Sequence, residues 1–341
     1  MSSSADNPFS SSKAATTTRR GKQSWNYTPP LPVTASPWFR WPFDFHAVFK
    51  WILRGWYPLT ERSIILGFAL VSWWLLPPIE SMQTISVGWA LGIYSRNVAL
   101  MVLVAGGLHC YFYIWRCQGD ELRFDARPFK TNNRVFTFRS QVLDNVFWTL
   151  ASGVTVWTAY EVLMLWALAN GYLPTLSLTE QWPWLLLIIF LLPMWETVHF
   201  FVIHRVIHEV PLYERIHALH HRNTNVGPWS GLSMHPAEHV IYLSTVLIHF
   251  IVPAHPIIII FHLMYFTLSA ATTHTGYQGI IRYRKMLLPL GTFHHQMHHR
   301  YFQCNYGGLE VPLDQWTGSF HDGTAESHQR FLEQRKKKLQ S

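Results

Sequence analysis

The chain has 341 residues, of which 49% are hydrophobic and only 13% are charged, and it contains seventeen tryptophans and twenty-two phenylalanines. Soluble domains usually carry about twice that charged fraction, so this composition cannot cover a water-facing surface and favours a membrane protein. The formal charge of +8 is compatible with nucleic-acid binding. However, the basic residues alternate with apolar spans and no nucleic-acid-binding motif is present, so we expect no nucleic-acid partner.

The N-terminal part of the chain divides into two segments by composition. Residues 1–36 are rich in Ser, Thr and Pro and predict a disordered basic tail, because they cannot bury enough apolar surface to fold. Residues 37–62 mix aromatic side chains with Lys50 and Arg54, which favours the headgroup zone and predicts an interfacial segment. A helix packed on the protein's own surface is the alternative. Residues 63–341 are expected to form one membrane-embedded domain.

Several apolar segments follow that are long enough, or nearly so, to cross the roughly 20-residue thickness of a bilayer. Two shorter apolar runs, 240–252 and 257–271, are separated by Pro253 and Pro256 and predict a re-entrant or tightly paired hairpin. We therefore expect an all-α integral membrane fold with a cytoplasmic helical cap. The four full spans are expected near residues 63–78, 97–115, 145–170 and 183–203.

The distribution of basic residues predicts the orientation of these spans. Residues 79–95 and 171–182 contain no Lys or Arg, whereas residues 116–139 contain six. By the positive-inside rule, the N-terminus, the 116–139 loop, the histidine-rich segments and the C-terminus are then cytoplasmic. The membrane is expected to be a bacterial inner membrane or the endoplasmic reticulum.

Sixteen of the twenty histidines lie between residues 199 and 299, and eight of these form an H-x-x-x-H group followed by two H-x-x-H-H groups. On a helix, residues three and four apart lie over one another, so each group is expected to point its imidazoles at one spot. Neutral imidazole suits iron, zinc, copper or nickel. Nine rings are too many for one ion and suit two. The expected ligands are His204, His208, His217, His220, His221, His274, His295, His298 and His299.

The remaining histidines are open to a plainer interpretation. A lone histidine near an apolar segment is most often a hydrogen-bonded polar group, and we assign this role to His46, His109, His249, His255, His262, His321 and His328. The three groups differ, because burying so many polar nitrogens is costly unless a cation binds them. His199, His235, His239 and His294 are expected to be additional ligands or to support the ligands. Glu196 and His199, near the end of the fourth span, are expected to be functional, since ionisable groups at membrane depth are seldom idle.

The order of the three histidine groups, interrupted by a membrane hairpin, resembles the fatty acid hydroxylase and sterol desaturase superfamily of membrane non-haem di-iron enzymes. The resemblance covers about residues 140–320. The segment 231–238 (GLSMHPAE) is similar to one in sterol C4-methyl oxidases, and 274–277 (HTGY) is similar to the segment ahead of the third histidine group. Asn305, Tyr306 and Gly307, followed by Asp314 and 317–319 (TGS), resemble the ending of sterol C5-desaturases.

The resemblance implies an O2-dependent oxidase with two non-haem irons that hydroxylates or desaturates an unactivated C–H bond of a lipid, with a sterol-like substrate favoured. Asn305 and Asp314, which stand in the resembling ending, and Glu196 at membrane depth are the expected catalytic residues. Electrons are expected from a separate donor, because no haem, flavin or Rossmann signature is present. The basic 116–139 loop and the C-terminal tail are suited to an acidic redox partner such as cytochrome b5 or a ferredoxin.

Three other functions are compatible with parts of this sequence. A fatty acyl or sphingolipid hydroxylase of the same superfamily differs from the favoured reading only in its substrate. A membrane metal transporter would need ligands at mid-bilayer on broken helices, whereas these groups lie past the span ends. A membrane zinc hydrolase would carry H-E-x-x-H, but Glu209 follows its histidine pair instead of lying inside it.

Overall fold

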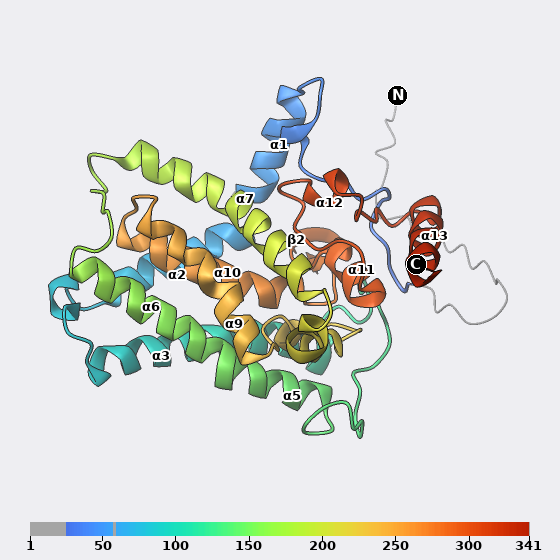
Figure 1. Cartoon of the computed structure of the whole chain (residues 1–341), viewed down its shortest axis with the longest axis horizontal. Helices are drawn as coiled ribbons and strands as arrows, with labels where there is room; N and C mark the ends of the chain where they lie inside the picture. Colours follow the sequence, from blue (N-terminus) through green and yellow to red (C-terminus); the bar gives the residue numbers. More distant parts are fainter. Residues whose placement is uncertain (1–24, 57–58, 341) are drawn as a thin grey trace.

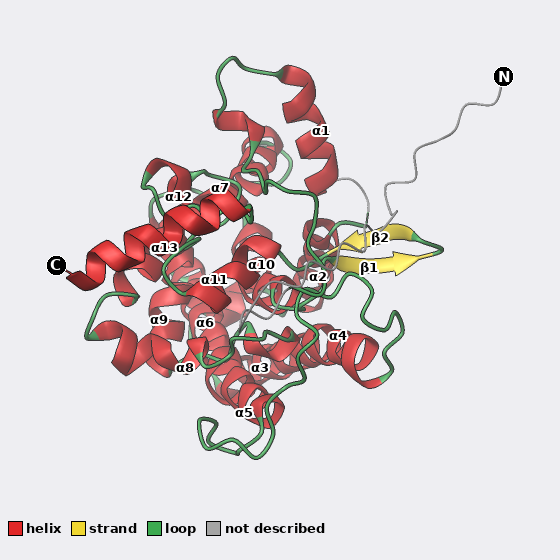
Figure 2. Ribbon diagram, turned by 90° about the vertical axis from the view of Figure 1, so that its right-hand side faces the viewer, coloured by secondary structure: helices red, strands yellow, loops and turns green. Residues whose placement is uncertain are grey.

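The computed structural model describes residues 25–56 and 59–340, and within these ranges the fold is almost entirely helical (Figure 1). One small antiparallel hairpin, β1 (Gly279–Arg282) and β2 (Lys285–Pro289), projects from the helices (Figure 2). The helices outside the long spans are α1 (Phe45–Trp56), α2 (Glu61–Leu75), α8 (Ala218–His221), α9 (Pro236–Leu243), α11 (Phe293–Tyr301), α12 (Leu313–Trp316) and α13 (Ala325–Gln340).

Four helices in the described part of the chain are long and apolar enough to cross a membrane. The first, Val87–Ile114, contains α3 (Val87–Met101), α4 (Gly107–His109) and two π-helical turns. The second, Gln141–Ala169, joins α5 (Gln141–Trp148) to α6 (Val154–Ala169) through another π-helical turn. The third is α7 (Trp182–Ile207) and the fourth is α10 (Pro256–Thr273). The prediction of a helical membrane protein with about four spans is confirmed.

The set of four differs from the expected set in one member. The span expected at 63–78 is α2, which has only 15 residues. It begins at Thr60, whose hydroxyl accepts a hydrogen bond from the Ser63 amide and caps the helix. The fourth long helix is instead α10, the second arm of the expected hairpin. Hydropathy alone placed the boundary wrongly because the apolar residues 76–78 continue past the end of α2.

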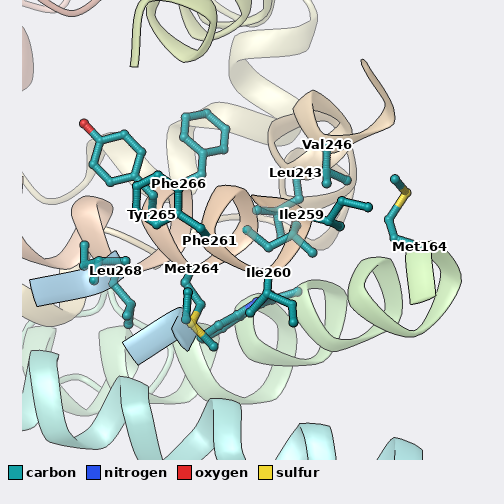
Figure 3. Packing of buried hydrophobic residues seen from close by; sticks show 14 of the residues in the cluster. Met164, Leu243, Val246, Ile259, Ile260, Phe261, Met264, Tyr265, Phe266 and Leu268 are labelled. Atoms are coloured by element: carbon teal, nitrogen blue, oxygen red, sulfur yellow. The ribbon is translucent and has the colours of Figure 1, made fainter. Parts of the chain in front are cut away.

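The helix α10 is the centre of the molecule and is enclosed by protein over 89% of its span. It runs antiparallel to α2, because Trp73 lies against His255 at one end and Thr272 donates a hydrogen bond to Glu61 at the other. Figure 3 shows side chains of α10 packing against Leu243, Val246 and Met164. Helices that are apolar all round are buried, and the run of isoleucines at 257–260 has this character.

The two ends of the helical bundle differ in content. At one end the connecting turns meet: Asn170 Nδ2 donates to Gln83 O at 3.1 Å, and Trp184 Nε1 donates to Pro253 O at 3.1 Å. At the other end lie α8, α11, α12 and α13 (Figure 1). All the predicted metal ligands are on segments at this second end or on the helix ends that reach it.

The N-terminal segments differ in their contacts with the bundle. Residues 25–36, the described part of the predicted tail, run along the cap; the Asn26 amide donates to Phe124 O and the Val33 amide to Asp322 O, both at 2.9 Å. Residues 1–24 lie outside the described residues. Next, α1 stands away from the bundle (Figures 1 and 2) and exposes an apolar stripe of Phe45, Phe49 and Leu53.

Candidate metal centre

Nine histidine side chains converge at the cap end of the bundle and form two clusters. We call the first the five-histidine cluster; it contains His204, His208, His217, His221 and His298, whose potential ligand atoms all lie within 4.8 Å of one another. The Nε2 atoms of neighbouring rings are 3.0–3.2 Å apart. The rings come from α7 and its C-terminal cap, from the π-helical turn Tyr213–His217, from α8 and from α11.

The second group, the four-histidine cluster, contains His220, His274, His295 and His299, again within 4.8 Å. The Nε2 atoms of the last three are 3.0–3.2 Å from one another. His274 is the C-terminal cap of α10, so the buried central helix delivers one ligand to this cluster. The structure thus brings together all nine histidines predicted as ligands, and it divides them five to four.

Each H-x-x-H-H triplet divides between the two clusters, instead of pointing at one spot as the spacing had suggested. The i and i+4 histidines go to one cluster, as with His217 and His221, while the i+3 histidine, His220, goes to the other. The same holds for His295, His299 and His298. Consecutive residues of an α-helix are about 100° apart, so an adjacent pair of histidines diverges and reaches two neighbouring sites.

The second nitrogen of most rings is held by a fixed acceptor. Nδ1–H of His204 and of His298 donates to the backbone oxygens of Tyr306 and Cys304, both at 2.6 Å, and that of His217 donates to Glu238 Oε1 at 2.7 Å. His274 Nδ1–H donates to Ala270 O at 2.7 Å, and His220 Nδ1–H to Ser233 O at 3.4 Å. A proton fixed on Nδ1 leaves the Nε2 lone pair free for a metal, so these contacts orient the rings inward.

The charge state of the rings also suits a cation. Burial lowers the pKa of the histidines that follow the spans well below the ordinary value, to about 4 for His274 and, with help from neighbouring imidazoles, to about 2 for His208. They are therefore neutral near pH 7. Nine neutral nitrogens facing one another leave lone pairs unsatisfied, which only protons or cations can relieve.

The spacing of the donor atoms tests whether metals fit. Imidazole nitrogens bind zinc at about 2.1 Å, and two such ligands at a right angle lie about 3 Å apart. The Nε2 separations of 3.0–3.2 Å match this. Donor type and spacing therefore fit one first-row transition metal ion in each cluster.

A cavity of about 1120 Å³ reaches the four-histidine cluster. Its lining includes His220, His274 and His295, together with apolar and aromatic side chains from α1, α7, α10 and β2. In the described part of the chain, none of the five-histidine cluster lines it. Phe200 lies between them, since it lines the cavity and stacks on His204 with ring centroids 4.5 Å apart. A molecule in the cavity would meet the four-histidine cluster.

The three residues predicted as catalytic occupy different places. Glu196 is buried and lines the cavity. Asp314 accepts hydrogen bonds from the amides of Tyr306 and Gly307 at 2.9 and 2.8 Å. Asn305 donates to His294 O and His321 O and accepts from the His321 amide. Asn305 and Asp314 therefore hold backbone, including the carbonyl that orients His204, while only Glu196 faces the cavity.

The four additional histidines stand outside both clusters. His199 Nε2 lies 3.1 Å from Ser244 Oγ, and His235 Nδ1 accepts from the Ala237 amide and caps α9. His239 is held between Ser152 Oγ and Leu232 O, both at 3.0 Å. His294 lines the cavity beside His295. The structure thus places these rings beside the clusters as packing, capping or cavity groups.

Glu238 was not assigned a role from sequence, although it lies in the quoted segment 231–238. Its carboxylate is buried and holds His217. The sequence does show a carboxylate between two histidines, in the segment H-P-A-E-H. Only the fold, however, brings Glu238 to the imidazole of His217, which lies 21 residues earlier in the chain. The polar residues of the cavity could not be predicted from the sequence either. Arg62 and Glu310, for example, are 248 positions apart and come together only in the fold.

These features define a class: a helical membrane protein whose cap holds two buried histidine clusters beside an apolar cavity. Comparison with known proteins agrees. Residues 187–319, which include all nine clustered histidines, match the fatty acid hydroxylase family. The histidine-rich part of the chain is therefore similar to the fatty acid hydroxylase family.

Several curated relatives carry sterol-related names. The chain is 25% identical over 284 residues to a Delta(7)-sterol-C5(6)-desaturase of Nicotiana tabacum, covering 80% of this chain and 94% of that one. It is 31% identical over 123 residues to human lathosterol oxidase, covering 35% and 40%. It is also 34% identical over 142 residues to fatty acid hydroxylase domain-containing protein 2 of Macaca fascicularis, covering 40% and 39%. No solved structure matches.

Proposed function

We propose that this protein is a membrane-bound, O2-dependent di-iron oxidase that hydroxylates or desaturates an unactivated C–H bond of a sterol-like lipid. The observation that carries the proposal is the four-histidine cluster at the wall of a large, mostly apolar cavity. An apolar cavity with a few convergent polar groups is the usual form of a lipid-sized binding site. The names of the relatives support a sterol-type substrate.

The residues proposed to hold the two irons are the nine clustered histidines. Bound iron supplies the capacity to reduce O2 and to abstract hydrogen from carbon. The protein's own contribution is to fix most of the imidazoles through an Nδ1 partner, to keep the rings neutral, and to exclude water. Phe200, Met234 and Phe266 line the cavity near these rings and favour the aliphatic part of a substrate over a soluble metabolite.

The proposed route for the substrate is from the lipid. Side chains of α1 and of β2 line the cavity, and Phe45, Phe49 and Leu53 form an exposed apolar stripe on α1. A helix with such a stripe and basic residues beside it suits the membrane interface. In this proposal α1 lies in the headgroup zone, and lipid enters the cavity between α1 and the β1–β2 hairpin.

The proposed electron donor is an acidic redox protein that docks on the cytoplasmic face. Of the basic residues in the 116–139 loop, Arg123 and Arg127 form ion pairs with Asp120 and Asp125 and are partly or fully buried. Arg116, Lys130, Arg134 and Arg139 are exposed, although Arg116 also lies 3.3 Å from Asp120. The exposed four offer positive charge to an acidic partner. Cytochrome b5 and a ferredoxin are the two donor types to try.

The test is to supply the purified, iron-loaded protein with a donor, its reductase and 18O2, and to compare extracted lipids by mass spectrometry with a His298→Ala control. A labelled hydroxyl group identifies hydroxylation, and loss of two hydrogens without label identifies desaturation. A fatty acyl product in place of a sterol product would support the acyl hydroxylase alternative. Oxidation of a water-soluble compound with no change in any lipid would refute the proposal.

A further inference from the structure

One part of the cavity wall is polar. The lining is largely apolar, but it includes five polar side chains from four separate segments. These side chains interact with one another through hydrogen bonds or electrostatically. They come from α2, from α7, from α10 and from the segment after α11. We call this group the Glu196 patch, and its members are Arg62, Glu196, Thr197, Tyr265 and Glu310.

Four members of the patch satisfy one another. Arg62 Nε donates to Tyr265 Oη at 3.0 Å, and Arg62 Nη2 forms an ion pair with Glu310 Oε1. Thr197 Oγ1 donates to Glu310 Oε2 at 3.2 Å. Charged and bidentate contacts of this kind fix side-chain positions. The patch is therefore a preformed surface and not a set of mobile side chains.

Glu196 is the exception. It is only 6% exposed, and its Oε1 is buried with no hydrogen-bond partner among the described residues. His262 Nε2 lies 3.9 Å from that oxygen, beyond hydrogen-bonding distance. A buried carboxylate with incomplete hydrogen bonding is costly. The other carboxyl oxygen, Oε2, is not among the fully buried atoms and also makes no hydrogen bond to a described residue. Since the side chain lines the cavity, a donor group on a bound molecule can reach Oε2.

The charge of the patch selects the kind of group. Two carboxylates, Glu196 and Glu310, face one guanidinium, and Glu61 is close enough to interact with Glu196 as well. The one guanidinium is already paired with Glu310, so the patch has no spare positive charge for a carboxylate, phosphate or sulfate group. A neutral hydroxyl needs none, because it can donate its own proton to Glu196. The basic residues Lys50 and Arg54 also line the cavity, but they are exposed on α1 and not in this buried wall.

The patch lies some way from the four-histidine cluster. On α10, Tyr265 of the patch and His274 of the four-histidine cluster are nine residues apart. At 1.5 Å per residue, this separation is about 13 Å along the helix. The same cavity is lined both by the Glu196 patch and by three histidines of the four-histidine cluster.

We propose that the Glu196 patch anchors the hydroxyl group of a lipid alcohol and excludes anionic headgroups, with Glu196 as the acceptor. The aliphatic body then extends toward the four-histidine cluster, about 13 Å farther along α10. The inference rests on the proposed function in one respect, since it takes the cavity to be the substrate site. Glu196 is then a specificity-determining residue, and nothing in its role requires iron to be present.

The experiment measures binding by the full-length, metal-free protein in nanodiscs. The probes are a fluorescent sterol with a free 3-hydroxyl, its 3-methyl ether and its 3-hemisuccinate, with a long-chain alcohol, its methyl ether and the matching fatty acid as competitors. A hydrogen bond to a charged group is worth about tenfold or more in affinity. We expect the alcohols to bind at least tenfold more tightly than their ethers and more tightly than the anions.

The variants assign that preference to Glu196. Glu196→Leu should abolish the alcohol-over-ether preference while changing ether affinity less than about threefold; Glu196→Gln, which keeps an acceptor oxygen and serves if the first variant unfolds, should reduce it severalfold. Glu180→Leu, the same change at an exposed site in the 170–181 turn, should retain it. Equal binding of alcohol and ether by the unmodified protein, tighter binding of the anions, or no binding of any alcohol would overturn the proposal.

The two proposals fail in different ways. If the iron-loaded protein oxidises a lipid but binds alcohol and ether equally, the anchor is wrong and the proposed function stands. If alcohols are preferred through Glu196 but no lipid is oxidised, the oxidase is wrong and the anchor stands.

Discussion

His220 and His221 are adjacent in sequence, yet their rings belong to different clusters: His221 lies within the five-histidine cluster and His220 within the four-histidine cluster. His298 and His299 are related in the same way. Each adjacent pair links the two clusters through a single peptide bond, on α8 and on α11. The separation of the two proposed irons is thus fixed by helix geometry.

Replacing one histidine of an adjacent pair should affect one iron more than the other. We expect His221→Ala and His220→Ala each to lose about one iron per protein while retaining the second, because only one cluster loses a ligand. Only His220→Ala should remove the iron beside the cavity, so a bound lipid should no longer perturb the metal spectrum. Iron analysis and the spectrum with and without lipid are the measurements.

The matched control is His46→Ala, because His46 is exposed on α1 and far in sequence from both clusters. It should keep two irons. If His220→Ala and His221→Ala both retained two irons and full activity, the ligand assignment would be wrong.

The contact between Glu238 and His217 gives a second prediction. Carboxylates behind a ligating histidine typically raise metal affinity 10- to 100-fold. Glu238→Ala should therefore weaken binding at the five-histidine cluster by roughly that factor, and Glu238→Gln, which still accepts a hydrogen bond, by less. Chelator competition measures the affinity. Glu333→Gln, at an exposed position of α13, should change nothing, and an equal effect there would show that the loss is not specific to His217.

The histidine clusters were largely predictable from sequence because their spacing is local. The pairs 204/208, 217/221 and 295/299 obey the four-residue period of a helix, so their shared direction follows from the chain itself. The division of each triplet between two clusters was missed. It depends on a second cluster lying about 100° around the helix, and only the packing of α8, α10 and α11 creates that second site.

The Glu196 patch could not be predicted in the same way. Arg62 and Glu310 are far apart in sequence and meet only because α2 packs beside α10 and the segment after α11 folds back over α7. The N-terminal tail shows the converse. Its average composition predicted disorder, but Trp25 lies 3.8 Å from the Arg300 guanidinium and against Phe293. A few aromatic residues hold this polar segment against the cap. The mean composition of the segment does not show the effect of so few residues.

Asp314 provides a prediction about stability. Its carboxylate accepts from two backbone amides and from Ser319 Oγ at 2.6 Å, and it holds the turn whose Tyr306 carbonyl orients His204. Asp314→Ala leaves buried amides unsatisfied, which costs about 1–3 kcal/mol. We expect a lower thermal midpoint in the metal-free protein and weaker iron binding. An unchanged midpoint would contradict this reading, and Glu121→Ala, at an exposed loop position, is the control.

The docking of α13 should depend on pH through His321. Burial, together with His328, His294 and Arg330 and against the opposing effect of Asp322, lowers the pKa of His321 to about 4. The ordinary value is about 6.5. Because the undocked ring takes up a proton first, docking is strongest above pH 6.5 and weakens as pH falls toward 4, by about 1–2 kcal/mol at pH 5.

Hydrogen exchange of the α13 amides, corrected for intrinsic rates, measures this effect. Protection should be lower at pH 5 than at pH 7.5. In His321→Gln, which cannot titrate, most of that difference should disappear. If the variant and the unmodified protein lost the same protection, His321 would not be the responsible group.

The final prediction concerns sidedness, which follows from charge and from the two ends of the bundle. The turns at 79–86 and 170–181 lie at the end opposite the histidine clusters and carry no Lys or Arg, whereas the 116–139 loop is basic. Single cysteines at Ser86 and Thr175 should therefore react with an impermeant reagent added outside, and cysteines at Thr131 and Glu326 should be protected. All four positions are exposed, so protection reports the membrane and not burial. The background must lack Cys110, Cys117 and Cys304, which are free thiols, and must retain two irons. Labelling of Thr131 and Glu326 from outside, with protection of the other two, would place the clusters on the opposite face and remove the cytoplasmic electron donor from the proposal.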